Sequence, residues 1–294
     1  MKTVRLTIPV LAIIILGLFF TGCASKKGLV GKNGYAIQYQ LNEGDKFTMS
    51  SSSLVSTEID QMGQVITSEI IGKSVDNCVV LSADKNTGNT IEMEIVERVQ
   101  DLESAQGSNS TDFSGLAGNK VIFDVLKTGK VENIKGLEKL PAITTLDGST
   151  LTEETYKMAV EGFFIKLPEN NTKIGESWID DQTQEVPIGG GILKVTGKTS
   201  YTLLEEVEKN GFKCLKIGIE GVSNVSGNLE QNGMALTLDR ETTITGNMYF
   251  AIEKGMYIAV ETESKAKGII GVEAMGMEIP QNMLTKATMT VVFN

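Results

Sequence analysis

The chain has 294 residues, with 27 lysines and arginines against 37 aspartates and glutamates and no histidine, which gives a net charge of −10. The lack of histidine excludes Ser-His-Asp and Cys-His catalytic devices and histidine-ligated zinc, copper and haem sites. The acidic balance repels phosphate backbones and anionic headgroups, so it argues against nucleic-acid binding and against a basic face that docks on membranes.

The first 22 residues have the pattern of a secretory signal peptide. Lys2 and Arg5 precede an apolar run from Leu6 to Phe20, which is shorter than the ~20 residues that a membrane-spanning helix needs. The run ends in Phe20-Thr21-Gly22-Cys23. This tetrapeptide resembles the bacterial lipobox, in which a peptidase cuts before a cysteine whose sulfur has been diacylated. The alternative is an ordinary signal peptide followed by an incidental cysteine.

The lipobox resemblance implies that Cys23 becomes the first residue of the mature chain and carries acyl chains such as palmitate. Each buried CH₂ contributes about 0.8 kcal/mol, so two or more chains anchor a protein stably without a transmembrane helix. Residues 24–34 are small, polar and glycine-containing, and 23–34 are therefore predicted to form a lipidated flexible tether. In lipoproteins that resemble this one, Asp after the cysteine favours the inner membrane and an acidic tract favours surface export. Ala24 and Ser25 match neither pattern, so we expect an outer-membrane lipoprotein facing the periplasm, in a host with two membranes.

Beyond the tether, alternating segments rich in β-branched residues dominate the chain. Residues 35–41, 90–95 and 218–222 each place polar groups on one face and apolar groups on the other, and 287–293 form another such run. This alternation is typical of antiparallel sheet with one wet face. Short turns separate paired runs at hairpin spacing; they are Gln61-Met62-Gly63-Gln64, Asn86-Thr87-Gly88-Asn89 and Lys209-Asn210-Gly211.

One segment, from Thr150 to Leu167, changes to a helical period. Its apolar stripe lies on one side of a helix of about four turns; the stripe consists of Tyr156, Ala159, Val160, Phe163, Phe164 and Leu167. Thr150 and Glu153 have the spacing of a capping box, and Pro168 ends the pattern. The stripe has two interpretations, namely packing against the sheet and contact with a ligand or partner.

Glycine-containing motifs before the helix recur after it, which indicates an internal repeat. Gly44-Asp45-Lys46-Phe47 corresponds to Gly175-Glu176-Ser177-Trp178, and Gly72-Lys73-Ser74 to Gly197-Lys198-Thr199. We therefore predict a mainly β protein with a minor α component, made of two tandem curved antiparallel sheets or half-barrels of a duplicated unit. The predicted parts are a signal peptide (1–22), the tether (23–34), a first repeat (35–148), a connecting helix (149–168) and a second repeat (169–294). One continuous, strongly bent sheet is the alternative to two separate ones.

Cys78 and Cys214 are the two remaining cysteines, and both lie in strand-like segments. Two interpretations stay open. They are buried thiols that act as small hydrophobes, or they form a disulfide, which an exported compartment permits.

The chemical motifs elsewhere are incomplete. Gly72-Lys73-Ser74 and Gly197-Lys198-Thr199 lack the glycine that a phosphate-binding loop needs five positions earlier. Residues 84–89 lack the glycine and glutamate positions of a calcium loop and read as a hairpin turn. Adjacent acids such as Asp180 and Asp181 point to opposite faces of a strand and cannot converge on one substrate. We therefore predict no catalytic residue, no metal site and no cofactor.

The lipobox, the two glycine-acid turns before an aromatic residue, and Phe164-x-x-Leu167-Pro168 before Gly175-Glu176-Ser177-Trp178 resemble a family of uncharacterised secreted bacterial lipoproteins. The motifs of that family are structural, so the resemblance transfers no active residue. A curved sheet with a helix also resembles the lipoprotein-carrier superfamily, whose half-barrels hold acyl chains. That resemblance is one of architecture, and a fold does not determine a function.

Two functions remain. The first is a non-enzymatic, membrane-anchored envelope lipoprotein that binds an amphiphilic ligand or a partner protein in the concavity of its sheets. Tyr156, Phe163 and Phe164 are the candidate ligand-binding residues, and late methionines such as Met275, Met277 and Met283 favour an adaptable apolar surface. The second is a structural or scaffolding envelope lipoprotein with a fully packed core and no small-molecule ligand.

Overall fold

The computed structural model describes residues 30–31, 34–61, 63–84, 87–105, 107–145, 150–188, 191–231, 234–272, 274 and 276–294. The predicted signal peptide and Cys23 lie outside these residues. The mainly β class is confirmed, with α1 (Glu153–Gly162) and the short 3₁₀ turns η1 (Ser114–Leu116) and η2 (Leu137–Lys139). The strands are β1 (Val30–Gly31), β2 (Gly34–Tyr35), β3 (Lys46–Gln61), β4 (Gln64–Asp84), β5 (Gly88–Ser104), β6 (Gly107–Ser110), β7 (Lys120–Leu126), β8 (Val131–Lys135), β9 (Ile143–Thr144), β10 (Thr150–Leu151), β11 (Ser177–Ile188), β12 (Gly191–Lys209), β13 (Phe212–Gln231), β14 (Met234–Ala251), β15 (Met256–Val272) and β16 (Met277–Phe293).

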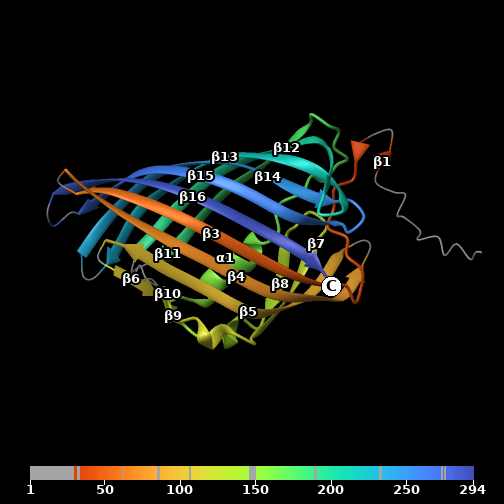
Figure 1. Cartoon of the computed structure of the whole chain (residues 1–294), viewed down its shortest axis with the longest axis horizontal. Helices are drawn as coiled ribbons and strands as arrows, with labels where there is room; N and C mark the ends of the chain where they lie inside the picture. Colours follow the sequence, from red (N-terminus) through yellow and green to blue (C-terminus); the bar gives the residue numbers. More distant parts are fainter. Residues whose placement is uncertain are drawn as a thin grey trace, which may run out of the picture.

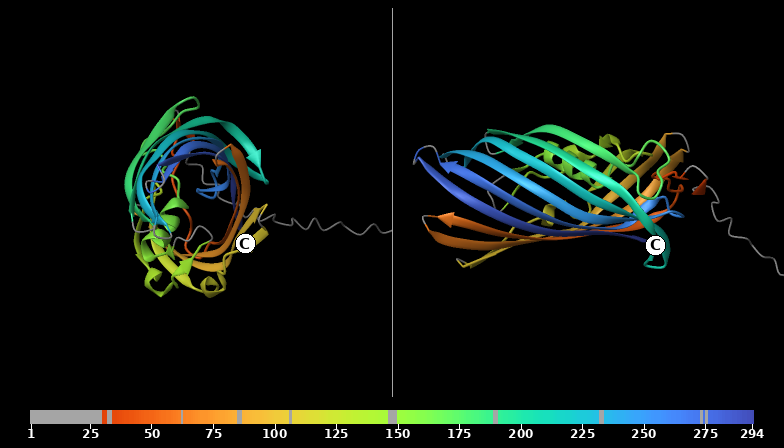
Figure 2. Two further views of the ribbon diagram at one scale, coloured as in Figure 1. Left: turned by 90° about the vertical axis from the view of Figure 1, so that its left-hand side faces the viewer. Right: turned by 90° about the horizontal axis from the view of Figure 1, so that it is seen from above.

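One antiparallel sheet of 12 strands organises the molecule, in the order β11-β12-β13-β14-β15-β16-β3-β4-β5-β7-β8, with β6 paired to β5. The two parts of the chain join where β16 pairs with β3, from Phe293 opposite Phe47 to Gln281 opposite Ile59. Of the two predicted arrangements, the continuous bent sheet is therefore the one present. Its long strands run obliquely in Figure 1. The end-on view on the left of Figure 2 shows that the sheet is strongly curved, with its strands arranged around a common axis.

The hairpins follow the turn chemistry of the sequence. Lys209 pairs with Phe212 across a two-residue loop in which Asn210 and Gly211 have φ of 52° and 80°. Positive φ at both loop positions is the type I′ geometry that an Asn-Gly pair favours. Gln61 likewise pairs with Gln64 across the predicted turn between β3 and β4.

The sheet has two distinct faces, which we call inner and outer. The inner face carries the residues that are buried at one end of the strands, such as Met49, Met248 and Val291. Apart from a register shift between Tyr249 and Phe250, the regular register keeps alternate residues of each strand on that face. The outer face carries most of the charged side chains, for example Lys265 and Lys267 of β15 and Glu241 of β14.

The core fills one end of the inner face. Residues 35–41 were predicted as a strand, and this prediction is wrong beyond Tyr35, because the segment lies in the core as an extended chain outside the sheet. Its alternation is real, since Ile37, Tyr39 and Leu41 are buried. The Tyr39 ring meets those of Phe164 and Phe250 edge-on, with centroids 5.3 and 6.0 Å away.

The helix is shorter than predicted. α1 covers 10 residues, and its capping box is formed by Thr152 and Thr155 instead of Thr150 and Glu153. Thr150 belongs to β10, where it pairs with Thr144 of β9. The residues after Gly162 leave the helix and still enter the core, which is why their apolar spacing extended the predicted helix. None of the described helices is long and apolar enough to cross a membrane.

The two parts of the chain share some local geometry. Gly44 and Gly175, which open the proposed repeats, have φ of 85° and 89°. Strands β3, β4 and β5 are consecutive neighbours, as are β11, β12 and β13. The duplication itself stays a prediction.

Candidate ligand-binding site

The predicted ligand-binding aromatics lie in the core. Tyr156 and Phe164 are buried, and the Tyr156 hydroxyl donates a 2.8 Å hydrogen bond to the Pro141 carbonyl. Phe163 is half-buried against the core, and its carbonyl accepts a 2.7 Å hydrogen bond from the Tyr257 hydroxyl. These contacts match the packing interpretation of the stripe.

The core covers only one end of the strands. On the inner face, the main cluster ends at Met49, Tyr201, Ile219, Met248 and Val260. Figure 1 shows the long strands continuing past α1 towards the opposite end of the molecule. We call this part of the inner face the uncovered half. Its apolar side chains are half-buried or buried by their neighbours in the sheet; they include Val55, Ile59, Ile66, Ile70, Val225, Leu236, Leu238, Ile244, Ile270, Val272, Ile279 and Met283.

One arginine lies on this apolar surface. Arg240 of β14 is opposite Val225 and Gly268, eight residues from the buried Met248 on the same face. Its Nη1 lies 3.4 Å from the sulfur of Met283, and its buried Nε has no hydrogen-bond partner among the described residues. Burial lowers the pKa of its guanidinium.

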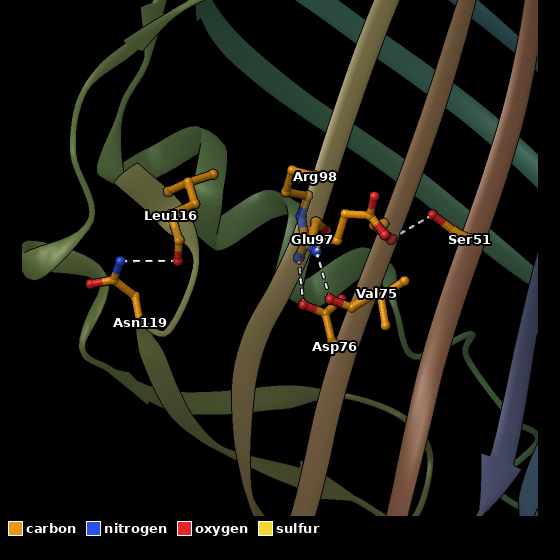
Figure 3. Close-up of polar contacts among 8 residues, drawn as sticks. Ser51, Val75, Asp76, Glu97, Arg98, Leu116 and Asn119 are labelled. Carbon is orange, nitrogen blue, oxygen red and sulfur yellow. Dashed lines mark hydrogen bonds and ion pairs between the residues drawn. The ribbon is translucent and has the colours of Figure 1, made fainter. Parts of the chain in front are cut away.

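An ion pair marks the border between the core and the uncovered half (Figure 3). Arg98 Nη2 donates a 2.7 Å hydrogen bond to Asp76 Oδ1, and its Nη1 donates to the carbonyls of Glu97 at 2.8 Å and Val75 at 3.3 Å. Asp76 is 1% exposed, and burial, opposed by Arg98, raises the pKa of its carboxyl group. The adjacent hydroxyls of Ser51 and Ser74 bond each other at 2.7 Å.

A second pair lies at the β11 edge. Lys166 Nζ is 3.0 Å from Asp180 Oδ1, and Gln182 Nε2 donates a 2.7 Å hydrogen bond to Asp180 Oδ2. Asp180 is buried while Asp181 is exposed, so the predicted opposite orientation of the two acids is confirmed. The pair lies beside a cavity of about 540 Å³, which Phe164 and Tyr201 also line. Burial raises the pKa of Tyr201 to about 12.

Another hollow is an open groove of about 1150 Å³. Most of its lining side chains are outer-face residues of β3, β4 and β12 to β16, among them Leu54, Leu204, Thr245, Glu261 and Lys286. The groove mixes both charges with apolar groups, and it does not include the predicted aromatics.

The two cysteines are free and buried in separate clusters. Cys78 belongs to the main core, whereas Cys214 packs with Ala251 and Ile258. Burial raises the pKa of both thiols, that of Cys214 to about 11. Of the two interpretations, buried thiols are therefore the arrangement present.

The glycine-lysine triplets lie inside strands β4 and β12, so neither forms a phosphate-binding loop before a helix. Within the part of the chain that the structure describes, no three or more acidic or cysteine side chains form a group that could hold a metal ion.

Sequence reasoning missed Arg240. Its signal is local, because Leu236, Leu238 and Arg240 share a face while Asp239 and Glu241 share the other. A charged residue in phase with apolar neighbours on a strand was the pattern to notice.

Comparisons with known proteins give a family and distant structural likenesses. Residues 79–257 match the profile of a family of unknown function (DUF6263). No curated protein matches the sequence. An outer membrane channel of Pseudomonas putida F1 is 10% identical with a TM-score of 0.25, and OccK11 (OpdR) of Pseudomonas aeruginosa is 7% identical with a TM-score of 0.21. Each match covers 86% of this chain and 98% of the other. Such low scores carry no argument.

Proposed function

The chain belongs to this family of unknown function, and from that premise we propose that it is a non-enzymatic envelope lipoprotein that binds an amphiphilic ligand on the inner face of its curved sheet. The observation that carries the proposal is the uncovered half of that face. Burying apolar surface there contributes roughly 25 cal/mol per Å² removed from water. A ligand with an apolar chain obtains this stabilisation, and the core end of the face, which is already filled, does not supply it.

The anchor belongs to the same proposal. Cys23 carries the acyl chains, and the body faces the periplasm from the outer membrane. In a Cys23→Ala variant, radiolabelled palmitate is no longer incorporated and the protein moves from the membrane fraction to the soluble fraction. The anchor is contradicted if the wild-type protein incorporates no palmitate and the Cys23→Ala variant fractionates as the wild type does.

The ligand is tested by native mass spectrometry with organic extraction, on the body from Ala24 purified from a bacterial periplasm. The matched pair is Ile270→Gln and Ile269→Gln, since these neighbours in β15 occupy opposite faces and Ile269 is 43% exposed on the outer one. A co-purifying amphiphile that is lost from Ile270→Gln and kept by Ile269→Gln supports the proposal. Wild-type protein that takes up no amphiphile, even when offered one, overturns it.

A scaffolding role is the second candidate, and the burial of Tyr156 and Phe164 favours it. In that case the apolar residues serve stability alone. An envelope protein that co-purifies with an empty body, and is lost from outer-face variants, supports this second function.

A further inference from the structure

Arg240 is the only charged residue among the described inner-face positions of β13 from Leu215 onward, β14, β15, β16 and β3. Its neighbours on that face are apolar or uncharged. The adjacent acids in β14, Asp239 and Glu241, point to the outer face. Nothing on these five strands therefore neutralises Arg240 from within the sheet.

The two buried acids of the described residues are already engaged. Asp76 pairs with Arg98 at 2.7 Å, and Asp180 pairs with Lys166 at 3.0 Å. A guanidinium keeps its charge at all ordinary pH values, so Arg240 cannot escape the cost of burial by losing its proton. Partial burial of this charge, with Nε unpartnered among the described residues, is unfavourable, and a ligand that supplies a negative charge relieves that cost.

The sheet also makes room for this side chain. A Cβ atom at Gly268, opposite Arg240, would lie 2.9 Å from the Cβ of Arg240 and 2.7 Å from the Asp239 carbonyl oxygen. Glycine therefore permits Arg240 to extend across β15 to Met283 of β16, where its Nη1 lies 3.4 Å from the sulfur. The side chain is partly buried, and its Nε lies buried on the inner face.

The surface on the two sides of Arg240 differs. Towards the core, the inner-face neighbours are mostly small or polar, such as Thr242, Ser223 and Ser264, with Ile244 as the large apolar exception. Towards the hairpins at the far ends of β13 to β16, they are apolar: Leu236, Leu238, Ile270, Val272 and Ile279. This order, a cation followed by an apolar strip, complements an anionic head group followed by an acyl chain.

We infer that the ligand is an anionic amphiphile, whose carboxylate or phosphate pairs with the Arg240 guanidinium and whose chain runs along the apolar strip towards the hairpins. The inference rests on the proposed function and names the chemical class of its ligand. Arginine suits this role because its planar fork donates two parallel hydrogen bonds to a carboxylate or phosphate. Binding therefore supplies the hydrogen-bond partner that the buried Nε lacks among the described residues.

The test compares laurate, dodecyl phosphate and dodecanol, which share one alkyl chain and differ in the head group. Isothermal titration measures their affinity for the body from Ala24 and for the variants Arg240→Gln and Lys267→Gln. Lys267 is the matched control, since it is an exposed outer-face cation of β15 that is opposite Glu241. Charge-assisted hydrogen bonds contribute about 1.5–3 kcal/mol. We therefore expect Arg240→Gln to lower the affinity for laurate and dodecyl phosphate about tenfold or more. Arg240→Gln should leave the affinity for dodecanol unchanged. Lys267→Gln should leave the affinity for all three compounds unchanged.

The outcomes distinguish a failure of the anionic head group from a failure of the proposed function. Equal affinity of wild-type protein for laurate and dodecanol overturns the anionic head group and leaves amphiphile binding standing. No binding of any of the three compounds overturns the proposed function as well. The comparison of laurate with dodecyl phosphate distinguishes a carboxylate from a phosphate head. If Arg240→Gln does not fold by circular dichroism, the wild-type ratio of laurate to dodecanol affinity decides alone.

Discussion

Arg98 Nη2 donates a 2.7 Å hydrogen bond to Oδ1 of Asp76, whereas Oδ2 of the same carboxylate has no partner among the described residues. Both residues lie where the packed end of the inner face gives way to the uncovered half. A buried pair that is only partly satisfied contributes little net stability, but losing one member is costly because the other stays buried and charged. The first two predictions follow from this asymmetry.

Arg98→Met should lower the free energy of unfolding by about 3 kcal/mol near neutral pH, because it leaves Asp76 without a cation. Replacing both members, as Arg98→Met with Asp76→Leu, should bring stability back to within about 1 kcal/mol of wild type. Urea unfolding followed by circular dichroism measures both. A double variant as unstable as the single one shows that the pair is stabilising in itself.

The same carboxyl group should make stability depend on pH. Burial raises the pKa of Asp76 above its ordinary value of 3.8, so the folded state binds a proton more tightly than the unfolded state. Its contribution to stability is therefore greatest at low pH and is lost as pH rises through the folded pKa. The free energy of unfolding of wild type, relative to that of the non-titrating Asp76→Asn variant, should therefore fall as pH rises from about 3.5. If wild type instead gains stability relative to Asp76→Asn as pH rises, Arg98 outweighs burial.

The strands were predictable because a side-chain period of two is a local property of the sequence. The segment 35–41 shows the limit of this signal, since any extended chain with one buried side alternates, whether or not it joins a sheet. The pairing of β16 with β3 joins residues at opposite ends of the chain, such as Phe293 and Phe47, and no local pattern encodes it. Arg240 could not be identified as a site residue for a related reason. A charged residue on a strand indicates a site only once it is known which of its faces is the inner face of the sheet.

Replacing each of the two adjacent phenylalanines should separate packing from ligand binding. Phe164 is buried between Tyr39 and Phe123, with ring centroids at 5.3 and 5.8 Å. Phe164→Ala should therefore lower the free energy of unfolding by about 3 kcal/mol or more. The half-buried Phe163 serves as the control, and Phe163→Ala should cost less than half as much. Ligand affinity that falls in Phe163→Ala without a change in stability supports a binding role for that residue.

The two thiols should be unreactive in the folded protein. Only the thiolate is alkylated, and burial raises the pKa of both Cys78 and Cys214, so little thiolate forms and reagents cannot reach it. At about pH 8, iodoacetamide should modify neither cysteine of the folded body from Ala24, and both once urea unfolds it. Mass spectrometry counts the adducts. An unfolded protein that takes up no label without reductant contains a disulfide, which contradicts this arrangement.

Gly129 should tolerate alanine poorly, for two additive reasons. Its φ of 90° is a left-handed conformation, which costs an L-residue about 1–2 kcal/mol. An added Cβ would also lie 2.5 Å from the Ile165 carbonyl oxygen and 2.8 Å from the Tyr39 ring, both parts of the core. Gly118 is the matched control, because its φ is 81° and a Cβ there meets nothing within 4 Å. Gly118→Ala should lose only the backbone contribution, and Gly129→Ala clearly more, in urea unfolding. Equal losses in the two variants would mean that the chain from Ile165 to Leu167 moves aside freely, so that the core end of the inner face is less tightly packed than its contacts indicate.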